Sequence, residues 1–190
     1  VTLVIIIVGL SSGMLQETAK RIEGVGADIM LQPPSASVFL AFSGAPMPVA
    51  IADKLVEVPG VKAVAPVMIQ ASTSGGVTLI YGIDPASFDR VTGGFQYLQG
   101  RGLETPDAVV VDDVYASSRG LKVGQNVELL NQQFRLTGIV EHGQGARIFV
   151  RLDRLQDLMG SVGKASVFFV KVTDPARASA VMEQMRQLLP

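Results

Sequence analysis

Residues 1–10 contain no charged side chain, and the first charge in the sequence is Glu17. Behind this run, apolar residues recur at the spacing of one helical face as far as Val25. An apolar helix that acquires a polar face is typical of the outer end of a membrane helix that continues into water. We therefore predict that residues 1–25 form the outer end of a membrane helix and a stalk. The membrane-helix end is predicted to comprise Val4, Ile5, Ile6, Ile7 and Val8.

The same apolar run has a second interpretation as a buried strand or core helix. A membrane span needs about 20 consecutive apolar residues. The membrane interpretation therefore expects further apolar residues ahead of Val1, whereas a core element expects none.

A third interpretation rests on Gly9, Ser11 and Gly13, which match the G-x-S-x-G pattern of a nucleophile elbow. The chain would then be a serine esterase, with Ser11 as nucleophile, His142 as base and a nearby aspartate. Against this stands the position of Ser11, because the strands and the oxyanion-hole loop that normally precede the nucleophile have almost no sequence to occupy. We keep the esterase as an alternative.

Composition removes several other classes of function. The 190 residues suffice for one ordinary domain or two small ones, and 48% of them are hydrophobic against 17% charged. The formal net charge is −1 and the basic residues are scattered, which argues against a nucleic-acid-binding protein. The sequence has no cysteine, one histidine and no Walker motif, so we expect neither a metal nor a cofactor in this chain.

Periodicity and turn residues predict an α+β fold with two lobes. A small β-rich segment, residues 95–145, separates residues 26–94 from residues 146–190. Without this insert the order is strand, helix, strand, strand, helix, strand, helix, which is close to a ferredoxin-like layer with its helices on one face of a mostly antiparallel sheet. The longer strands of this layer are predicted at residues 27–32, 61–73, 77–83 and 164–173, and a further short strand is predicted at residues 148–151.

Within the insert, Asp112 and Asp113 follow a buried strand and precede a short helix that ends at Gly120. Paired carboxylates suit acid–base chemistry or Mg²⁺ binding, but an N-cap explains them more simply. The loop 131–133 is predicted to join two strands, residues 100–103 are predicted to form a loop, and residues 141–145 a flexible connector. His142 in that connector is interpreted as a surface residue.

The segment 35–46 is a loop by its Ser, Gly and Pro content, yet it holds a cluster of apolar side chains. Such a cluster either contacts a partner protein or lipid, or folds back as a small separate core. Both interpretations stay open. The candidate contact residues are Val38, Phe39, Leu40 and Phe42.

Several stretches, in this order, resemble the extracytoplasmic domain of MacB/FtsX-type ABC transporter permeases. They are GVGADIMLQPP, LVEVPGVKAVAPV, IYGIDPASF, LQGRGLETPDAVVVDD, GLKVGQNVELLNQQFRLTGIV, FVRLDRLQDLMG and KASVFFVKV. The resemblance implies a ferredoxin-like porter lobe, here residues 26–94 and 146–190, with an inserted sabre lobe, here residues 95–145. It places the domain between two membrane helices, on the periplasmic or extracellular side of the inner membrane.

The resemblance also implies a non-enzymatic function. A cytoplasmic ABC ATPase, which holds the ATP and Mg²⁺, would drive the membrane helices, and this domain would pass their motion outward by mechanotransmission. The implied partners are that ATPase, a second permease copy, the membrane through the flanking helices, and a periplasmic adaptor or substrate protein. An FtsX-like alternative is a module that regulates a cell-wall hydrolase and moves no substrate.

Overall fold

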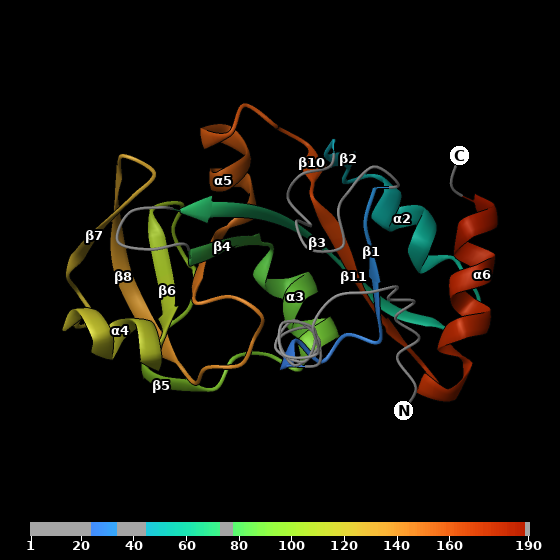
Figure 1. Ribbon diagram of the computed structural model, residues 1–190, viewed down its shortest axis with the longest axis horizontal. Coiled ribbons are helices and arrows are strands. Elements are labelled where there is room, and N and C mark those ends of the chain that lie inside the picture. Colours follow the sequence, from blue (N-terminus) through green and yellow to red (C-terminus); the bar gives the residue numbers. More distant parts are fainter. Residues whose placement is uncertain (1–23, 34–44, 73–77, 189–190) are drawn as a thin grey trace, which may run out of the picture.

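The computed structural model describes residues 24–33, 45–72 and 78–188, which build a large mixed sheet with helices packed on it (Figure 1). This arrangement confirms the α+β fold class. The helices are α2 (Ile51–Val56), α3 (Pro85–Thr92), α4 (Asp113–Arg119), α5 (Leu152–Leu158) and α6 (Ala178–Leu188), and a 3-10 turn, η1 (Pro175–Arg177), precedes α6. The strands are β1 (Ile29–Leu31), β2 (Met47–Pro48), β3 (Val61–Ser72), β4 (Thr78–Ile83), β5 (Tyr97–Gly100), β6 (Ala108–Asp112), β7 (Asn126–Leu129), β8 (Gln132–Val140), β9 (Ile148–Arg151), β10 (Lys164–Ala165) and β11 (Val167–Val172).

The main sheet has the strand order β1-β11-β3-β4-β9-β6-β8-β5, and β7 also pairs with β8. Neighbouring strands are antiparallel except for two parallel pairs, β4 with β9 and β6 with β8. The strand β9 pairs on one side with β4, from the predicted first lobe, and on the other with β6, from the predicted insert. Both predicted lobes therefore share one continuous sheet, while the lobe boundaries stay a prediction.

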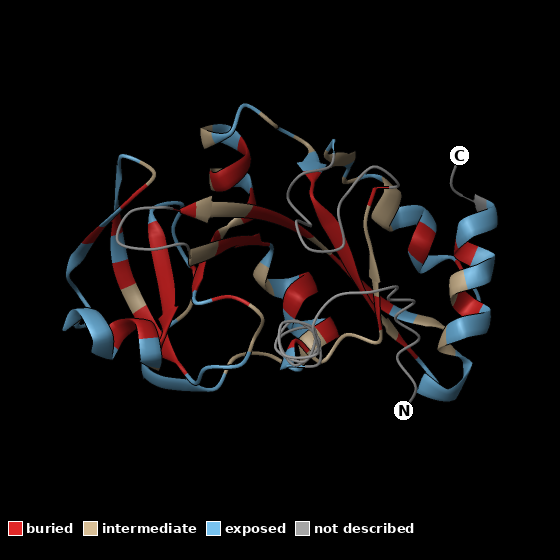
Figure 2. Ribbon diagram, in the orientation of Figure 1, coloured by how far each residue is buried: buried red, intermediate tan, exposed pale blue. Residues whose placement is uncertain are grey.

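Helices cover both faces of this sheet, so the prediction of helices on one face was wrong. In β3, Ala65 and Val67 point into a core with Phe88 of α3, whereas Val64 points into a core with α2 and α6. Successive side chains of a strand point to opposite faces, so α3 lies opposite α2 and α6. Met68 joins the core of α4 and α5 on the same face as Val64. The middle of β3 carries buried side chains on both faces, so helices pack against both faces of the sheet (Figure 2).

Aspartate side chains cap the N-termini of two short helices, α3 and α4. The Asp112 side chain accepts a hydrogen bond from the Tyr115 N–H at 2.6 Å, and Gly120 closes α4 with φ +63°. The Asp84 side chain likewise accepts from the Ser87 N–H at 2.9 Å, with a proline in the first turn of α3. These contacts confirm that Asp112 is an N-cap.

Two local predictions in the insert need correction. The turn between β7 and β8 consists of Leu130 and Asn131, both with positive φ, so residues 132 and 133 belong to β8. A two-residue turn with positive φ at both residues matches the twist of the flanking strands, so β7 and β8 can be joined without a third loop residue. Gly100, predicted in a loop, ends β5 and pairs with Gly138, because neither has a side chain to obstruct the close approach.

The predicted strand 164–173 is divided at Ser166. Its first part, β10, leaves the main sheet and pairs with β2, while β11 continues in the main sheet. Two hydrogen bonds fix Ser166 at the point where the strand divides. Its N–H donates to the Val67 carbonyl at 2.9 Å, and its Oγ atom accepts from the Ile69 N–H at 3.0 Å. A side-chain hydroxyl here replaces a main-chain partner of β3, which a hydropathy pattern does not reveal.

Candidate functional site

Several predicted site residues lie outside the described part of the chain. They are Val4, Ile5, Ile6, Ile7, Val8 and Ser11, and the apolar loop residues Val38, Phe39, Leu40 and Phe42. In the described ranges, no helix has the length and apolar character needed to cross a membrane. The membrane-helix end, the contact loop and the esterase nucleophile therefore stay predictions.

The base of the esterase alternative, His142, lies beside Asp113 at the start of α4. The His142 Nδ1 atom lies 3.0 Å from the Asp113 Oδ1 atom, and the His142 main-chain N–H donates to the same oxygen at 3.1 Å. Desolvation acts to raise the pKa of the Asp113 carboxyl, but the hydrogen bonds and charge of His142 outweigh it and the pKa is lowered. The exposed fraction of the His142 side chain is 60%, as expected for a surface residue.

Asp112 has a different environment from its neighbour. It is 3% exposed, and its Oδ2 atom lies 3.2 Å from the Arg147 guanidinium. Burial raises the pKa of the Asp112 carboxyl, although the Tyr115 N–H and the Arg147 charge act in the opposite direction. The two carboxylates thus serve separate partners, and the described residues contain no cluster of three potential metal ligands.

The segment that follows the predicted stalk is fixed between the connector 141–145 and the sheet. Val25 is 1% exposed and belongs to the core of α3, together with Tyr81. A Cβ atom on Gly145 would lie 2.5 Å from the Val25 Cγ2 atom, and Gly24 passes so close to the Gly143 carbonyl that no Cβ fits. The connector therefore closes tightly around the end of the stalk segment because its glycines have no side chains.

A lysine fixes the same segment from β11. The Lys171 Nζ atom donates to the Gly26 carbonyl at 2.8 Å and forms an ion pair with the Asp28 Oδ1 atom at 3.2 Å. The other Asp28 oxygen accepts the Val172 N–H at 2.9 Å. We call residues 24–28, with their contacts to 143–145 and Lys171, the N-terminal junction. It connects the predicted stalk directly to β11, the second strand from one edge of the sheet, and to the connector that leads from the insert to β9.

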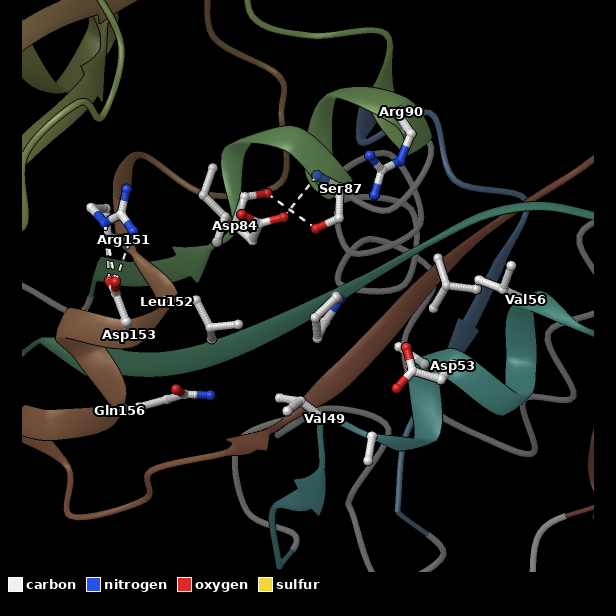
Figure 3. Close-up of a pocket in the computed structure, with 15 residues that line it drawn as sticks. Val49, Asp53, Val56, Asp84, Ser87, Arg90, Arg151, Leu152, Asp153 and Gln156 are labelled. Atoms are coloured by element: carbon white, nitrogen blue, oxygen red, sulfur yellow. Dashed lines mark hydrogen bonds and ion pairs between the residues drawn. The ribbon is translucent and has the colours of Figure 1, made fainter.

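A groove lies between α2 and α5, beside Asp84 and the first turns of α3, with β3 as its floor (Figure 3). Its volume is about 530 Å³. Figure 3 shows Asp53 on α2 at one wall and the Arg151–Asp153 pair at the other, with Asp84, Ser87 and Arg90 between them. The apolar lining residues are Val49, Ala50, Ala52, Val56, Val64, Pro66, Ile83 and Leu152.

Sequence reasoning missed both the N-terminal junction and the groove. One signal for the junction was present, because Lys171 is the only charge in the apolar stretch 167–172 and a lysine in a buried strand needs a partner. A second was the glycine content of 141–145, interpreted only as flexibility. The groove depends on the register of β4 against β3 and on which helices pack beside them, and both follow from contacts between distant residues that periodicity does not reveal.

The chain is similar to known periplasmic and extracellular domains. The family described as MacB-like periplasmic core domain matches residues 1–188. No curated protein matches the chain.

Three solved structures are among those with a fold similar to that of this chain. The extracellular domain of the noncanonic ABC-type transporter YknZ from Gram-positive bacteria is 15% identical, with 84% of this chain and 90% of that chain covered and a TM-score of 0.63. The periplasmic region of MacB from Actinobacillus actinomycetemcomitans is 17% identical, with 91% and 87% covered and a TM-score of 0.65. A domain of a putative permease protein from Porphyromonas gingivalis is 14% identical, with 77% and 73% covered and a TM-score of 0.52. At these identities the structures show a shared fold.

Proposed function

The chain belongs to the family of MacB-like periplasmic core domains, and we propose that, as the periplasmic domain of a MacB-like ABC transporter permease, it transmits movements of the membrane helices outward. The movements would be driven by ATP hydrolysis on a cytoplasmic ATPase. The outer surface of the domain would then act on a transported substrate or on a partner protein. In this role the domain is non-catalytic and holds no cofactor of its own.

The observation that carries the proposal is the N-terminal junction. A domain that receives motion from a stalk needs a stiff attachment at the point where the stalk ends. Here the attachment has three parts: a buried side chain, Val25; a charged clamp, Lys171 with Asp28; and close main-chain contact with residues 143–145. Packed interiors transmit displacement because they have few voids and low compressibility.

The proposal extends to the assembly of the whole permease. We expect two permease copies to associate with the ATPase, with ATP and Mg²⁺ bound there and with the flanking helices of this domain in the inner membrane. A periplasmic adaptor or substrate protein is the expected outer partner.

The first experiment uses the full-length parent protein, extracted from membranes in mild detergent. An ATPase subunit should co-purify and hydrolyse ATP. A parent that arrives alone, without any ATPase, would refute the proposed coupling.

The second experiment measures the motion itself. The 190 residues contain no cysteine, so Glu128→Cys at an exposed position of β7 adds one spin-label site to this domain in each permease copy, and any cysteine elsewhere in the parent protein is first replaced by serine. The distance between the two labels should differ between the nucleotide-free complex and the complex trapped with an ATP analogue. An unchanged distance in a complex that hydrolyses ATP would contradict transmission through this domain.

A further inference from the structure

The long strand β3 lacks a strand partner along half of one side. The first half of β3 pairs with β11, from Val61 opposite Val172 to Val67 opposite Val167, whereas β4 pairs only with the second half, from Val67 opposite Ile83 to Ser72 opposite Thr78. Beyond Ile83 the chain turns into α3. Among the described residues, no strand therefore covers positions 61–66 on the β4 side, an edge about 20 Å long.

The main-chain groups of Val64 point into this gap. Val64 lies opposite Val170 of β11, and the Val170 carbonyl accepts the Asp28 N–H at 2.9 Å on the side of β1. The N–H and C=O of one strand residue point to the same side, so Val170 directs its groups to β1, away from β3. Val64 then directs its own groups away from β11, towards the absent continuation of β4. Pro66, the next residue with this orientation, has no N–H and is tolerated where a strand has no partner.

This open edge forms part of the groove rather than of a flat surface. Val64 and Pro66 both line the groove, and the walls come from α2 on one side and from the start of α3 and α5 on the other (Figure 3). Val64 is 5% exposed, so its N–H and C=O are sheltered, and sheltered main-chain groups are almost always paired in folded proteins. The wall residue Val56 leaves 51% of its surface exposed, which is a large fraction for valine beside an apolar floor.

The charges around the groove favour a basic occupant. Its lining holds three carboxylates, on Asp53, Asp84 and Asp153, against two guanidinium groups, on Arg90 and Arg151. Arg151 and Asp153 neutralise each other in an ion pair of 2.8 Å. Asp53 and Asp84 form no ion pair with another described residue, so two negative charges face one positive charge.

We infer that this groove binds an extended polypeptide segment of a partner protein, with alternating apolar and basic side chains, as an added strand along the open edge of β3. Main-chain hydrogen bonds to Val64 would supply affinity, and the apolar floor with the two carboxylates would supply selectivity. The inference stands on the sheet geometry and on the charges of the groove, and it does not depend on the proposed transmission of motion.

The test uses the ¹⁵N-labelled 190-residue chain and the peptide acetyl-VKVRV-amide, titrated to 2 mM. We expect a Kd between about 0.1 and 1 mM, because a short added strand forms few hydrogen bonds. The Val64 amide should shift on binding and become protected from hydrogen exchange. A peptide with the same sequence and N-methylated amides along one edge keeps the side chains but cannot add as a strand, so it should bind at least about tenfold more weakly.

A matched pair of variants tests the charge preference. Asp53→Asn removes a carboxylate from the groove, and the control Asp157→Asn removes an exposed carboxylate of α5 that does not line it. We expect a Kd about two- to fivefold higher for the first variant and an unchanged Kd for the second.

Three results would overturn the inference. One is the absence of any shift at the Val64 amide up to 2 mM peptide. Another is equal binding of the N-methylated peptide, which would make the groove an ordinary apolar contact. The third is a Val64 amide already protected before peptide is added, because the edge would then be covered by the chain itself or by a second copy.

Discussion

Replacing Lys171 with methionine tests whether the clamp at the N-terminal junction stabilises the fold. Methionine keeps the length and apolar stem of lysine but removes the ammonium group. The change leaves the Gly26 carbonyl without its 2.8 Å donor and the Asp28 carboxylate, whose side chain is 14% exposed, without its ion-pair partner. Asp28 keeps the hydrogen bond from the Val172 N–H.

The expected cost follows from these two losses. A hydrogen bond from a charged donor contributes about 1.5–3 kcal/mol, and the 31% exposure of the Lys171 side chain places this one at the lower end. The partly screened ion pair adds about 0.5–1 kcal/mol. We therefore expect Lys171→Met to lower the free energy of unfolding by about 2–2.5 kcal/mol.

Urea unfolding of the chain measures this cost. With an m-value of about 2 kcal/mol per molar urea, the midpoint should fall by roughly 1 M at an unchanged m-value. Asp28→Asn and the double variant complete a cycle, in which we expect a coupling energy of about 1 kcal/mol. A loss below about 0.5 kcal/mol for Lys171→Met, or strict additivity in the cycle, would refute the clamp.

Three further predictions concern other contacts. Gly145→Ala should lower the free energy of unfolding by more than about 2 kcal/mol, and by more than the control Gly160→Ala. Both glycines have positive φ, but only at Gly145 would a Cβ atom collide with Val25. Equal unfolding midpoints for the two variants would contradict this close packing. Ser166→Ala should cost about 1–2 kcal/mol by leaving the buried Ile69 N–H without an acceptor, and a change within the error of urea unfolding would exclude that role. Burial raises the pKa of the Asp112 carboxyl, so the folded chain binds this proton more readily than the unfolded chain. The free energy of unfolding of the wild type, measured relative to Asp112→Asn, should therefore increase as the pH falls from the raised pKa to the ordinary value of 3.8. A difference between the two proteins that stays constant over this pH range would show that the pKa is not raised.

The element order was predictable from the sequence because its signals are local. The N-cap Asp112 and the helix-ending Gly120 act on neighbouring main-chain groups, so their residue types alone mark the ends of α4. The bounds of β3 were likewise predictable, because its mostly apolar stretch lies between the turn signals at residues 59–60 and 74–76. The resemblance to MacB-like domains, first noted on short ordered motifs, is confirmed by the family match over residues 1–188.

The features that were missed depend on contacts between distant parts of the chain. Lys171 reaches Asp28 across 143 positions of sequence, and Ser166 reaches Ile69 across 97. Neither partner can be chosen from spacing, because each pairing follows from the register of β11 against its neighbours. The same limit applies to the faces of the sheet, since the apolar residues of β3 do not reveal which helix covers which side.

The position of β9 has a mechanical consequence. It is hydrogen-bonded to β4 on one side and to β6 on the other, so every path across the sheet from β1 to β5 passes through it. A bend between the two halves would have to break main-chain hydrogen bonds in the middle of the sheet, where Ile148 and Phe149 are fully buried. Under the proposed function, we therefore expect a push applied at one end of the sheet to reach the other end with the two halves turning together.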